Sequence, residues 1–373
     1  MRTTVPAGAL PWVVALALSA PAVAAPVTPR DTATSALERA AFVALPAVYN
    51  VSGDILIEAI VTGSRRIPIG RTLPIHGTAF GVAQNRVVTA LHLVAPPTAR
   101  ILDELGALDV QGLPTDPSTA RVITRRVTKV TLTRAQAEAS AFACAGEVPT
   151  TIAAAVGRAA TNADDDLVLL KINDPNAPTL SLNDDQNAGR RVAAIGFGGQ
   201  SSEIPAIRDG TVIGPARIQA NDAFTTIEID ILRGDSGAPV IDEHGQSHGM
   251  VLRRETDATK PVMAQAKSVR RLLDADGVTN RESAATTDFR TAMATFWDRD
   301  YALAERRLAA LAQTYTSAAL ARCEGRQAAA LANASYERAG PSRARAAILA
   351  LGAMAALAAA LLGILRVRRH PLE

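Results

Sequence analysis

The chain has 373 residues, of which 48% are hydrophobic and 20% charged, and its net charge is +3. This balance excludes an intrinsically disordered chain, which combines low hydrophobicity with high net charge, and the length is enough for more than one domain. The basic residues are spread along the chain without a stripe of interleaved aromatic side chains, so we expect no nucleic-acid partner.

The first 24 residues have the composition of a secretory signal peptide. Arg2 provides the positive start, residues 9–20 form a mostly apolar run, and residues 22–24 form a small-residue cleavage site. The apolar run is short for a membrane-spanning helix, so a cleaved signal is favoured over an uncleaved anchor. Residues 25–47 are then predicted to be a linker, with a short helix over residues 35–45.

Short apolar runs separated by Gly, Pro, Asn and Asp residues fill the stretch from residue 48 to residue 277. Many short strands with turn signals between them are typical of a β-sandwich or a pair of β-barrels. A helix over residues 268–274, ended by Gly277, closes this predicted domain. The runs that predict strands are residues 55–57, 78–82, 86–90, 127–132, 167–172, 192–196, 210–214, 226–232 and 249–252.

Residues 278–340 have a different pattern, because apolar side chains recur mostly at three- and four-residue steps from Phe289 to Cys323. A charged break at residues 297–300 predicts the turn of a helical hairpin. We interpret this segment as a helical spacer that packs on itself or on a protein partner, which would bind through residues 286–340.

Residues 346–365 form an apolar run of about 20 residues, the length that a membrane-spanning helix needs. A buried Ala-rich helix is the alternative, which the length and the basic flanks disfavour. The denser basic cluster follows the run, so the tail of residues 366–373 is predicted to be cytoplasmic. Together with the signal peptide, this pattern predicts a single-pass protein of the cell (inner) membrane whose residues 25–340 lie in the periplasm or outside the cell.

The only two cysteines, Cys144 and Cys323, are far apart, and the chain has no Cys-x-x-Cys motif or Cys/His cluster. We therefore expect no metal and no cofactor. The two thiols are either paired in an oxidising compartment or free, and the pattern alone favours free cysteines.

Ser236 lies in the stretch Gly234-Asp-Ser-Gly-Ala-Pro239, after the predicted strand over residues 226–232. A serine on a tight turn next to glycines has an exposed hydroxyl with a backbone N–H close by, which suits a nucleophile in acyl transfer. Four residues of this kind also occur by chance, so the stretch needs partners elsewhere in the chain.

Two further residues supply those partners. A serine hydroxyl needs a base, and His92 follows the predicted strand over residues 86–90. The imidazole in turn needs a carboxylate on its other nitrogen. Three neighbouring aspartates are available, and Asp166 is preferred over Asp164 and Asp165 because it adjoins the strand that follows.

The three segments Thr89-Ala-Leu-His92, Asp166-Leu-Val-Leu-Leu170 and Gly234–Pro239 together resemble the motifs of trypsin-like serine proteases, in their bacterial, disulfide-free form. The resemblance covers about residues 48–277. Leu91 and Ala238 replace a commoner Ala and Gly, which changes bulk without touching the chemistry.

The resemblance implies a mainly β fold with two antiparallel six-stranded β-barrels, here followed by an α-helical segment and one transmembrane helix. His92 and Asp166 would come from the first barrel and Ser236 from the second. The N–H groups of Gly234 and Ser236 would form the oxyanion hole, with Asp235 buried to hold the loop. The implied activity is serine endopeptidase hydrolysis of polypeptide substrates through an acyl-enzyme.

Substrate preference stays open, because two observations point in opposite directions. Asp230 lies six residues before Ser236, where family members that cut after Arg or Lys carry an acid, but it also fits the polar face of the strand over residues 226–232. Arg253 and Arg254 follow the run over residues 249–252, where the substrate-edge strand is expected, and would favour acidic residues.

Two other functions compete with the endopeptidase. One is a protease-like fold that no longer cuts and acts as an envelope binding or sensor module, with residues 286–340 recruiting a partner. The other is an esterase with the same three residues. The intact set of His92, Asp166 and Ser236 favours an enzyme.

Overall fold

The computed structural model describes residues 35–134, 151–161, 165–199, 205–218, 221–252 and 261–315, together with helical residues at 321–322, 325–326, 328–330 and 332. Several predictions concern residues outside these ranges. They are the signal peptide over residues 1–24, the membrane span over residues 346–365, the tail over residues 366–373, the pairing of Cys144 and Cys323, and the roles of Asp164, Arg253 and Arg254.

The first half of the described chain forms a closed barrel of six antiparallel strands in the order β1-β2-β3-β6-β5-β4. Its strands alternate or run continuously apolar, so that side chains such as Ile57, Phe80 and Leu169 fill the interior. The strands are β1 (Val48–Thr62), β2 (Arg65–Ala83), β3 (Arg86–Ala90), β4 (Ala120–Arg134), β5 (Thr151–Ala159) and β6 (Leu167–Ile172).

A second closed barrel follows, with the strand order β10-β11-β12-β9-β8-β7 and again only antiparallel pairs. The prediction of two six-stranded antiparallel barrels is therefore confirmed. The strands are β7 (Arg191–Gly196), β8 (Ala206–Ile218), β9 (Asn221–Glu228), β10 (Pro239–Ile241), β11 (Ser247–Leu252) and β12 (Val262–Gln265).

One predicted strand is too long. The alternating pattern predicts a strand over residues 226–232, but β9 ends at Glu228. Beyond it the backbone serves a turn instead of the sheet, because the Leu232 N–H donates to the Asp235 carboxylate and the Leu232 carbonyl accepts from the Asp235 N–H. The alternation continues past the strand because Ile229 is still buried and Ile231 packs on the same cluster.

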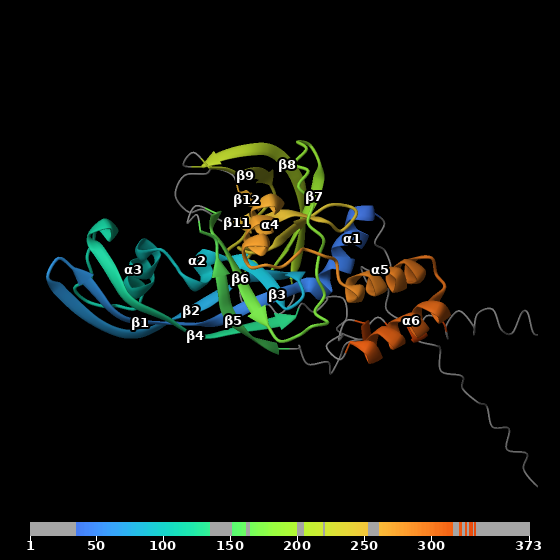
Figure 1. Ribbon diagram of the computed structural model, residues 1–373, viewed down its shortest axis with the longest axis horizontal. Helices are drawn as coiled ribbons and strands as arrows, with labels where there is room; N and C mark the ends of the chain where they lie inside the picture. Colours follow the sequence, from blue (N-terminus) through green and yellow to red (C-terminus); the bar gives the residue numbers. More distant parts are fainter. Residues whose placement is uncertain are drawn as a thin grey trace, which may run out of the picture.

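Helices precede the first barrel, follow strand β3 and follow the second barrel (Figure 1). The predicted helix over residues 35–45 is confirmed as α1, whose N-cap Ser35 forms a capping box with Glu38. The predicted closing helix is α4, and the predicted hairpin is α5 and α6. The helices are α1 (Ala36–Ala44), α2 (Leu91–Val94), α3 (Thr98–Ala107), α4 (Ala266–Ala275), α5 (Ala284–Trp297) and α6 (Tyr301–Thr314), with short 3-10 turns at Leu45–Ala47 and Pro117–Thr119.

α1 joins the helical hairpin to the barrels. Phe42 contacts Phe289 and Trp297 with ring centroids 6.0 and 6.2 Å apart, and the Arg39 guanidinium lies 5.3 Å from the Trp297 ring centre. The described part of the predicted linker is thus a packed helix, and α5 lies beside α1, on the side of the molecule opposite to α3 (Figure 1). Within the described residues, no helix combines the length and apolar character that crossing a membrane requires.

Candidate active site

His92 and Asp166 meet at the end of the first barrel. β3 and β6 pair directly, with Ala90 opposite Leu167, so the residues that follow β3 and precede β6 are neighbours. The Asp166 Oδ2 lies 2.7 Å from His92 Nδ1, and Asp166 Oδ1 accepts the His92 backbone N–H at 2.8 Å. The two side chains are 15% and 16% exposed, so both are largely buried but neither is sealed from solvent. This pair fixes the orientation of the imidazole.

Asp166 has a left-handed backbone conformation, which is uncommon for residues other than glycine and which aspartate tolerates better than most. Its φ is 49°, in the left-handed region. Three hydrogen bonds hold it there, because its carbonyl oxygen also accepts the Leu91 N–H at 2.9 Å in addition to the two carboxylate contacts with His92. A residue held in an uncommon backbone conformation by bonds to His92 and to the residue before it points to a role in positioning His92. Of the alternatives, Asp165 lies 3.7 Å from Arg271 instead.

The loop around Ser236 needs its two glycines. Gly234 and Gly237 have φ values of 105° and 94°, which favour glycine. A methyl group at Gly234 would lie 2.5 Å from the Phe197 carbonyl oxygen and 2.9 Å from His76 Nε2, and one at Gly237 would overlap the Thr78 carbonyl oxygen. The loop is therefore pressed between strand β2 of the first barrel and the end of β7 of the second.

The same contacts bring Ser236 to the first barrel. The Ser236 carbonyl accepts the Thr78 N–H at 2.9 Å. A methyl group at Gly77 would touch both Leu93, the residue after His92, and the Ser236 carbonyl oxygen at 3.2 Å. Ser236 and His92 thus lie on the same side of β2, across the junction of the two barrels. Ser236 is 7% exposed, and among the described residues its hydroxyl makes no hydrogen bond.

Two backbone N–H groups of the loop remain available to an oxyanion. The N–H groups of Asp235, Gly237 and Ala238 donate to backbone carbonyls within the fold. Those of Gly234 and Ser236 make no hydrogen bond to any described residue. Because buried N–H groups are nearly always paired, two unpaired ones that flank a serine form a site for developing negative charge.

Asp235 is fully buried, and its carboxylate holds this loop in place, as predicted. Its carboxylate accepts the Gly198 N–H at 2.7 Å and the Leu232 N–H at 2.8 Å, and the Arg208 guanidinium lies 3.1 Å away. Burial raises the pKa of the Asp235 carboxyl above its ordinary value, against the opposing effects of the Leu232 N–H and Arg208. Arg208 keeps a counter-charge next to a carboxylate that has no access to water.

Sequence reasoning missed Thr78, which ties the loop to the first barrel. Its hydroxyl donates to the Gly234 carbonyl at 2.8 Å and accepts the Phe197 N–H at 3.0 Å, and the side chain is fully buried. His76 was also missed. Its Nε2 lies 3.2 Å from the Phe197 carbonyl oxygen, so it too connects the two barrels. The signal for both was their position beside Gly77, where backbones approach closely.

Of the two residues predicted to set substrate preference, the structure describes Asp230 only. Asp230 is exposed and follows the end of β9, six positions before Ser236, and the described residues provide no ion pair for it. It is not part of the buried network that surrounds Asp235. Arg253 lies outside the described residues.

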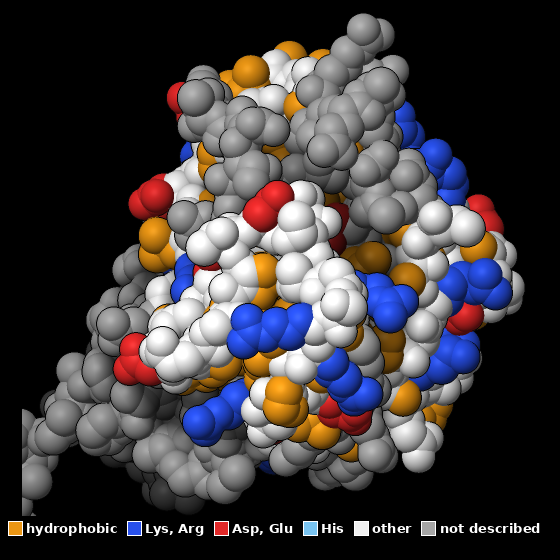
Figure 2. Space-filling view, turned by 90° about the vertical axis from the view of Figure 1, so that its left-hand side faces the viewer, with side chains coloured by type: hydrophobic (Ala, Val, Ile, Leu, Met, Phe, Trp, Pro, Cys, Tyr) orange, Lys and Arg blue, Asp and Glu red, His pale blue; other side chains and the backbone are white. Residues whose placement is uncertain are grey.

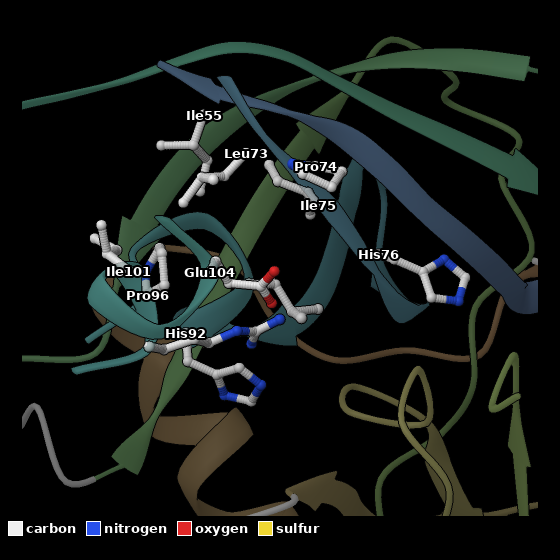
Figure 3. Close-up of a pocket in the computed structure, with 11 residues that line it drawn as sticks. Ile55, Leu73, Pro74, Ile75, His76, His92, Pro96, Ile101 and Glu104 are labelled. Atoms are coloured by element: carbon white, nitrogen blue, oxygen red, sulfur yellow. The ribbon is translucent and has the colours of Figure 1, made fainter. Parts of the chain in front are cut away.

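A pocket opens beside His92 in the first barrel (Figure 3). Ile55, Leu73 and Ile101 form its apolar part, whereas Glu104 projects toward the space between them and His92. The remaining lining residues are Pro74, Ile75, His76, Leu93, Pro96 and Arg100. All of them come from β1, β2, and the helical segment that follows His92, so the second barrel forms no part of this pocket.

Comparison with known proteins agrees with this geometry. Residues 77–250 match the family model described as trypsin-like peptidase domain, and the matched range contains all three predicted catalytic residues. No curated protein matches the chain. Residues 77–250 are thus similar to a trypsin-like peptidase domain, and the described chain folds into two closed six-stranded barrels.

Three solved structures to which the chain is similar are described as proteases. The Rv3671c protease from M. tuberculosis in its active form has 19% identity and a TM-score of 0.42, over 65% of this chain and 85% of that one. The HtrA-type protease AlgW with a decapeptide has 15% identity and a TM-score of 0.42, over 64% and 67%. A serine endoprotease from Yersinia pestis has 17% identity and a TM-score of 0.41, over 65% and 68%. At these values the fold assignment rests on the barrels and the family model.

Proposed function

We propose that the protein is a membrane-anchored, extracytoplasmic serine endopeptidase that hydrolyses peptide bonds through His92, Asp166 and Ser236. The observation that carries the proposal is the Asp166–His92 pair facing a glycine-framed serine loop with two unpaired N–H groups. The site thus combines an aspartate with positive φ that holds the imidazole, two glycines with positive φ that frame the serine, and two N–H groups without acceptors among the described residues. Acyl transfer is the chemistry that uses all three.

In the proposed reaction, the Ser236 hydroxyl attacks the carbonyl carbon of the scissile peptide bond. His92 Nε2 takes the hydroxyl proton, while Asp166 holds the Nδ1 proton and stabilises the imidazolium. The Gly234 and Ser236 N–H groups bind the oxyanion of the tetrahedral intermediate. His92 then gives its proton to the leaving amine, and a water molecule, activated by the same imidazole, hydrolyses the acyl-enzyme.

In the resting protein the Ser236 hydroxyl and the imidazole are not yet hydrogen-bonded. Such contacts often form only once substrate is bound, so the separation fits a resting enzyme. It also fits the rival function, a protease-like envelope binding or sensor module that does not cut. The difference between the two is whether Ser236 becomes nucleophilic.

Location is the second part of the proposal. The signal peptide predicted over residues 1–24 and the membrane span predicted over residues 346–365 would place both barrels in the periplasm or outside the cell, on a tether. The substrates would then be polypeptides of the same compartment. This topology can be tested with a reporter enzyme that is active on only one side of the membrane. The reporter is fused to the chain after residue 340 or after residue 373.

Labelling with a fluorophosphonate probe tests the activity directly. The wild-type chain should become covalently modified at Ser236, and Ser236→Ala should not react. His92→Ala should react much more slowly, because the probe also needs the base. A folded wild-type chain that is never modified would support the binding module and overturn the endopeptidase. If the chain is labelled but hydrolyses esters and no peptides, the esterase is the correct alternative.

A further inference from the structure

The pocket beside His92 lies where the leaving half of a substrate would bind. His92 must deliver a proton to the leaving nitrogen, so the chain that departs begins next to this imidazole. Both His92 and His76 line the pocket, and a methyl group at Gly234 of the oxyanion loop would lie 2.9 Å from His76 Nε2. A pocket that is lined by the general acid and by a neighbour of the oxyanion loop therefore faces the residues that follow the scissile bond.

One of the charged side chains that line this pocket has no oppositely charged partner among the described residues. It is lined by one arginine and one carboxylate, Arg100 and Glu104, which are four residues apart on α3. Glu104 already has a partner, because its Oε1 accepts a hydrogen bond from Arg233, the residue before Gly234. Among the described residues, no carboxylate lies within ion-pair distance of Arg100.

Arg100 is a cation in need of an anion. It is half-buried and lies beside the apolar side chains of Ile55, Leu73 and Ile101, so water solvates it only in part. Guanidinium groups bind carboxylates with two parallel hydrogen bonds, and partial burial strengthens such a pair. On the face of the molecule that carries the β1–β2 hairpin and α3, Lys and Arg side chains lie at the centre and right-hand side, with Asp and Glu side chains among them (Figure 2).

Glu104, which lines this pocket, forms an ion pair with Arg233 that joins the two barrels. Glu104 belongs to α3 of the first barrel, and Arg233 to the oxyanion loop of the second. The Arg233 side chain is 69% exposed, so the pair can open to solvent at little energetic cost. When it opens, Arg233 becomes a second cation beside the same pocket.

On the basis of the proposed peptidase function, we infer that Arg100 binds the carboxylate of an acidic residue close after the scissile bond. Glu104 limits this selectivity, because it competes with the substrate for Arg233 and repels a second carboxylate. The inference adds a specificity-determining residue on the leaving side, in the first barrel, whereas Asp230 and Arg253 concern the acyl side in the second.

The test measures kcat/KM for a set of peptides that differ at one position only. Each of the first three positions after the scissile bond carries Asp, Asn or Lys in turn. The wild-type chain should prefer Asp over Asn about tenfold at one of these positions, as expected for a charged hydrogen bond. Arg100→Gln should remove that preference, and Arg100→Glu should reverse it in favour of Lys. Glu104→Gln should increase it, because Arg233 is then free.

Matched controls come from exposed residues outside the pocket. Arg71→Gln removes a positive charge from β2, and Asp103→Asn removes a negative charge from the exposed side of α3. Both should keep the wild-type preference, which separates a local contact from a change in overall charge.

Probe labelling of each variant makes the outcomes distinguishable. A chain that reacts with the probe and cuts Asp and Asn peptides equally would overturn this inference and leave the peptidase intact. An unchanged Asp preference in Arg100→Gln would do the same. A folded chain that neither reacts nor cuts any peptide would overturn the proposed function, and this inference with it.

Discussion

The described residues contain two histidine–aspartate pairs, one in each barrel, and the two pairs have different roles. His92 in the first barrel uses its backbone N–H and Nδ1 to bind Asp166, while Nε2 has no partner among the described residues. His248 on β11 of the second barrel uses both ring nitrogens. Its Nδ1 lies 2.5 Å from the Asp185 carbonyl oxygen and its Nε2 lies 3.0 Å from Asp242 Oδ2.

Burial separates the two pairs further. The His248 and Asp242 side chains are 0% and 2% exposed, and Arg190 lies against both of them. The Asp242 carboxylate also accepts the N–H groups of His244 and Gln246, so it stabilises the turn between β10 and β11. A histidine with every polar atom engaged stabilises a fold. A histidine with one nitrogen free at the mouth of a pocket can exchange protons with a substrate.

The comparison is tested most strongly by removing each imidazole. His92→Ala should lower kcat/KM by about 10⁶-fold with little change in the free energy of unfolding, because the lost nitrogen acts in the transition state. His248→Ala should leave Ser236 reactive toward a fluorophosphonate probe but lower the free energy of unfolding by about 3 kcal/mol, because Asp242 loses a partner while it stays buried. Peptide hydrolysis and urea unfolding of both variants measure these effects. A large loss of stability in His92→Ala would contradict the division of roles.

Asp166→Asn tests the positioning half of the first pair. The amide keeps the size of the side chain but places a donor where His92 Nδ1 needs an acceptor, so the imidazole is held in the wrong tautomer. We expect kcat/KM to fall by about 10⁴-fold. The matched change Asp165→Asn, next to it in the chain and close to Arg271, should alter kcat/KM less than threefold, or about 0.6 kcal/mol. Equal losses in the two variants would show that Asp166 has no special role.

Thr78→Val tests the attachment of the oxyanion loop to the first barrel. Valine keeps the shape but removes the hydroxyl that donates to the Gly234 carbonyl and accepts the Phe197 N–H. The loop then loses its fixed geometry, and kcat should fall by about 10²-fold, the loss seen for a missing oxyanion contact. The control is Thr225→Val, which also removes a buried hydroxyl, in this case one bound to Gln186 and Gln265 of the second barrel. It should reduce stability without changing kcat.

The sequence was sufficient for the parts of this site that are local. The order of His92, Asp166 and Ser236, and the glycines around the serine, are visible because each lies in a short stretch with its own turn or strand pattern. The apolar runs predicted many short strands but left a sandwich and a pair of barrels open, and the resemblance to trypsin-like serine proteases then implied two six-stranded barrels. The end of β9 was not, because burial alternates on through Ile231 after the backbone has left the sheet.

What the sequence did not reveal are contacts between distant segments. Thr78 and Gly234 are 156 residues apart, and Glu104 and Arg233 are 129 apart. Arg208 reaches Asp235 from a different strand of the same barrel. A threonine on a strand or an arginine on a surface has no local signature of these roles, because the partner is chosen by how the barrels meet. Only the three-dimensional arrangement reveals them.

The pH dependence of stability tests the structural role of the His248–Asp242 pair. Burial raises the pKa of the Asp242 carboxyl, but the hydrogen bonds from His248 and from the Gln246 and His244 N–H groups outweigh it, so the pKa lies below its ordinary value of 3.8. The unfolded chain therefore binds more protons at this site than the folded chain does. The contribution is fully present above the unfolded-state pKa and is lost as the pH falls through the lower folded-state value.

Asp242→Asn should consequently lower the free energy of unfolding by about 2 kcal/mol at pH 7, through loss of a charged hydrogen-bond acceptor. The gap between the variant and the wild type should narrow as the pH falls below 3.8. Urea unfolding from pH 7 to pH 3 measures this gap, with Asp209→Asn, an exposed aspartate 3.6 Å from Arg191, as the control. A gap that stays constant over this range would mean that Asp242 stabilises the turn by its shape and not by its charge.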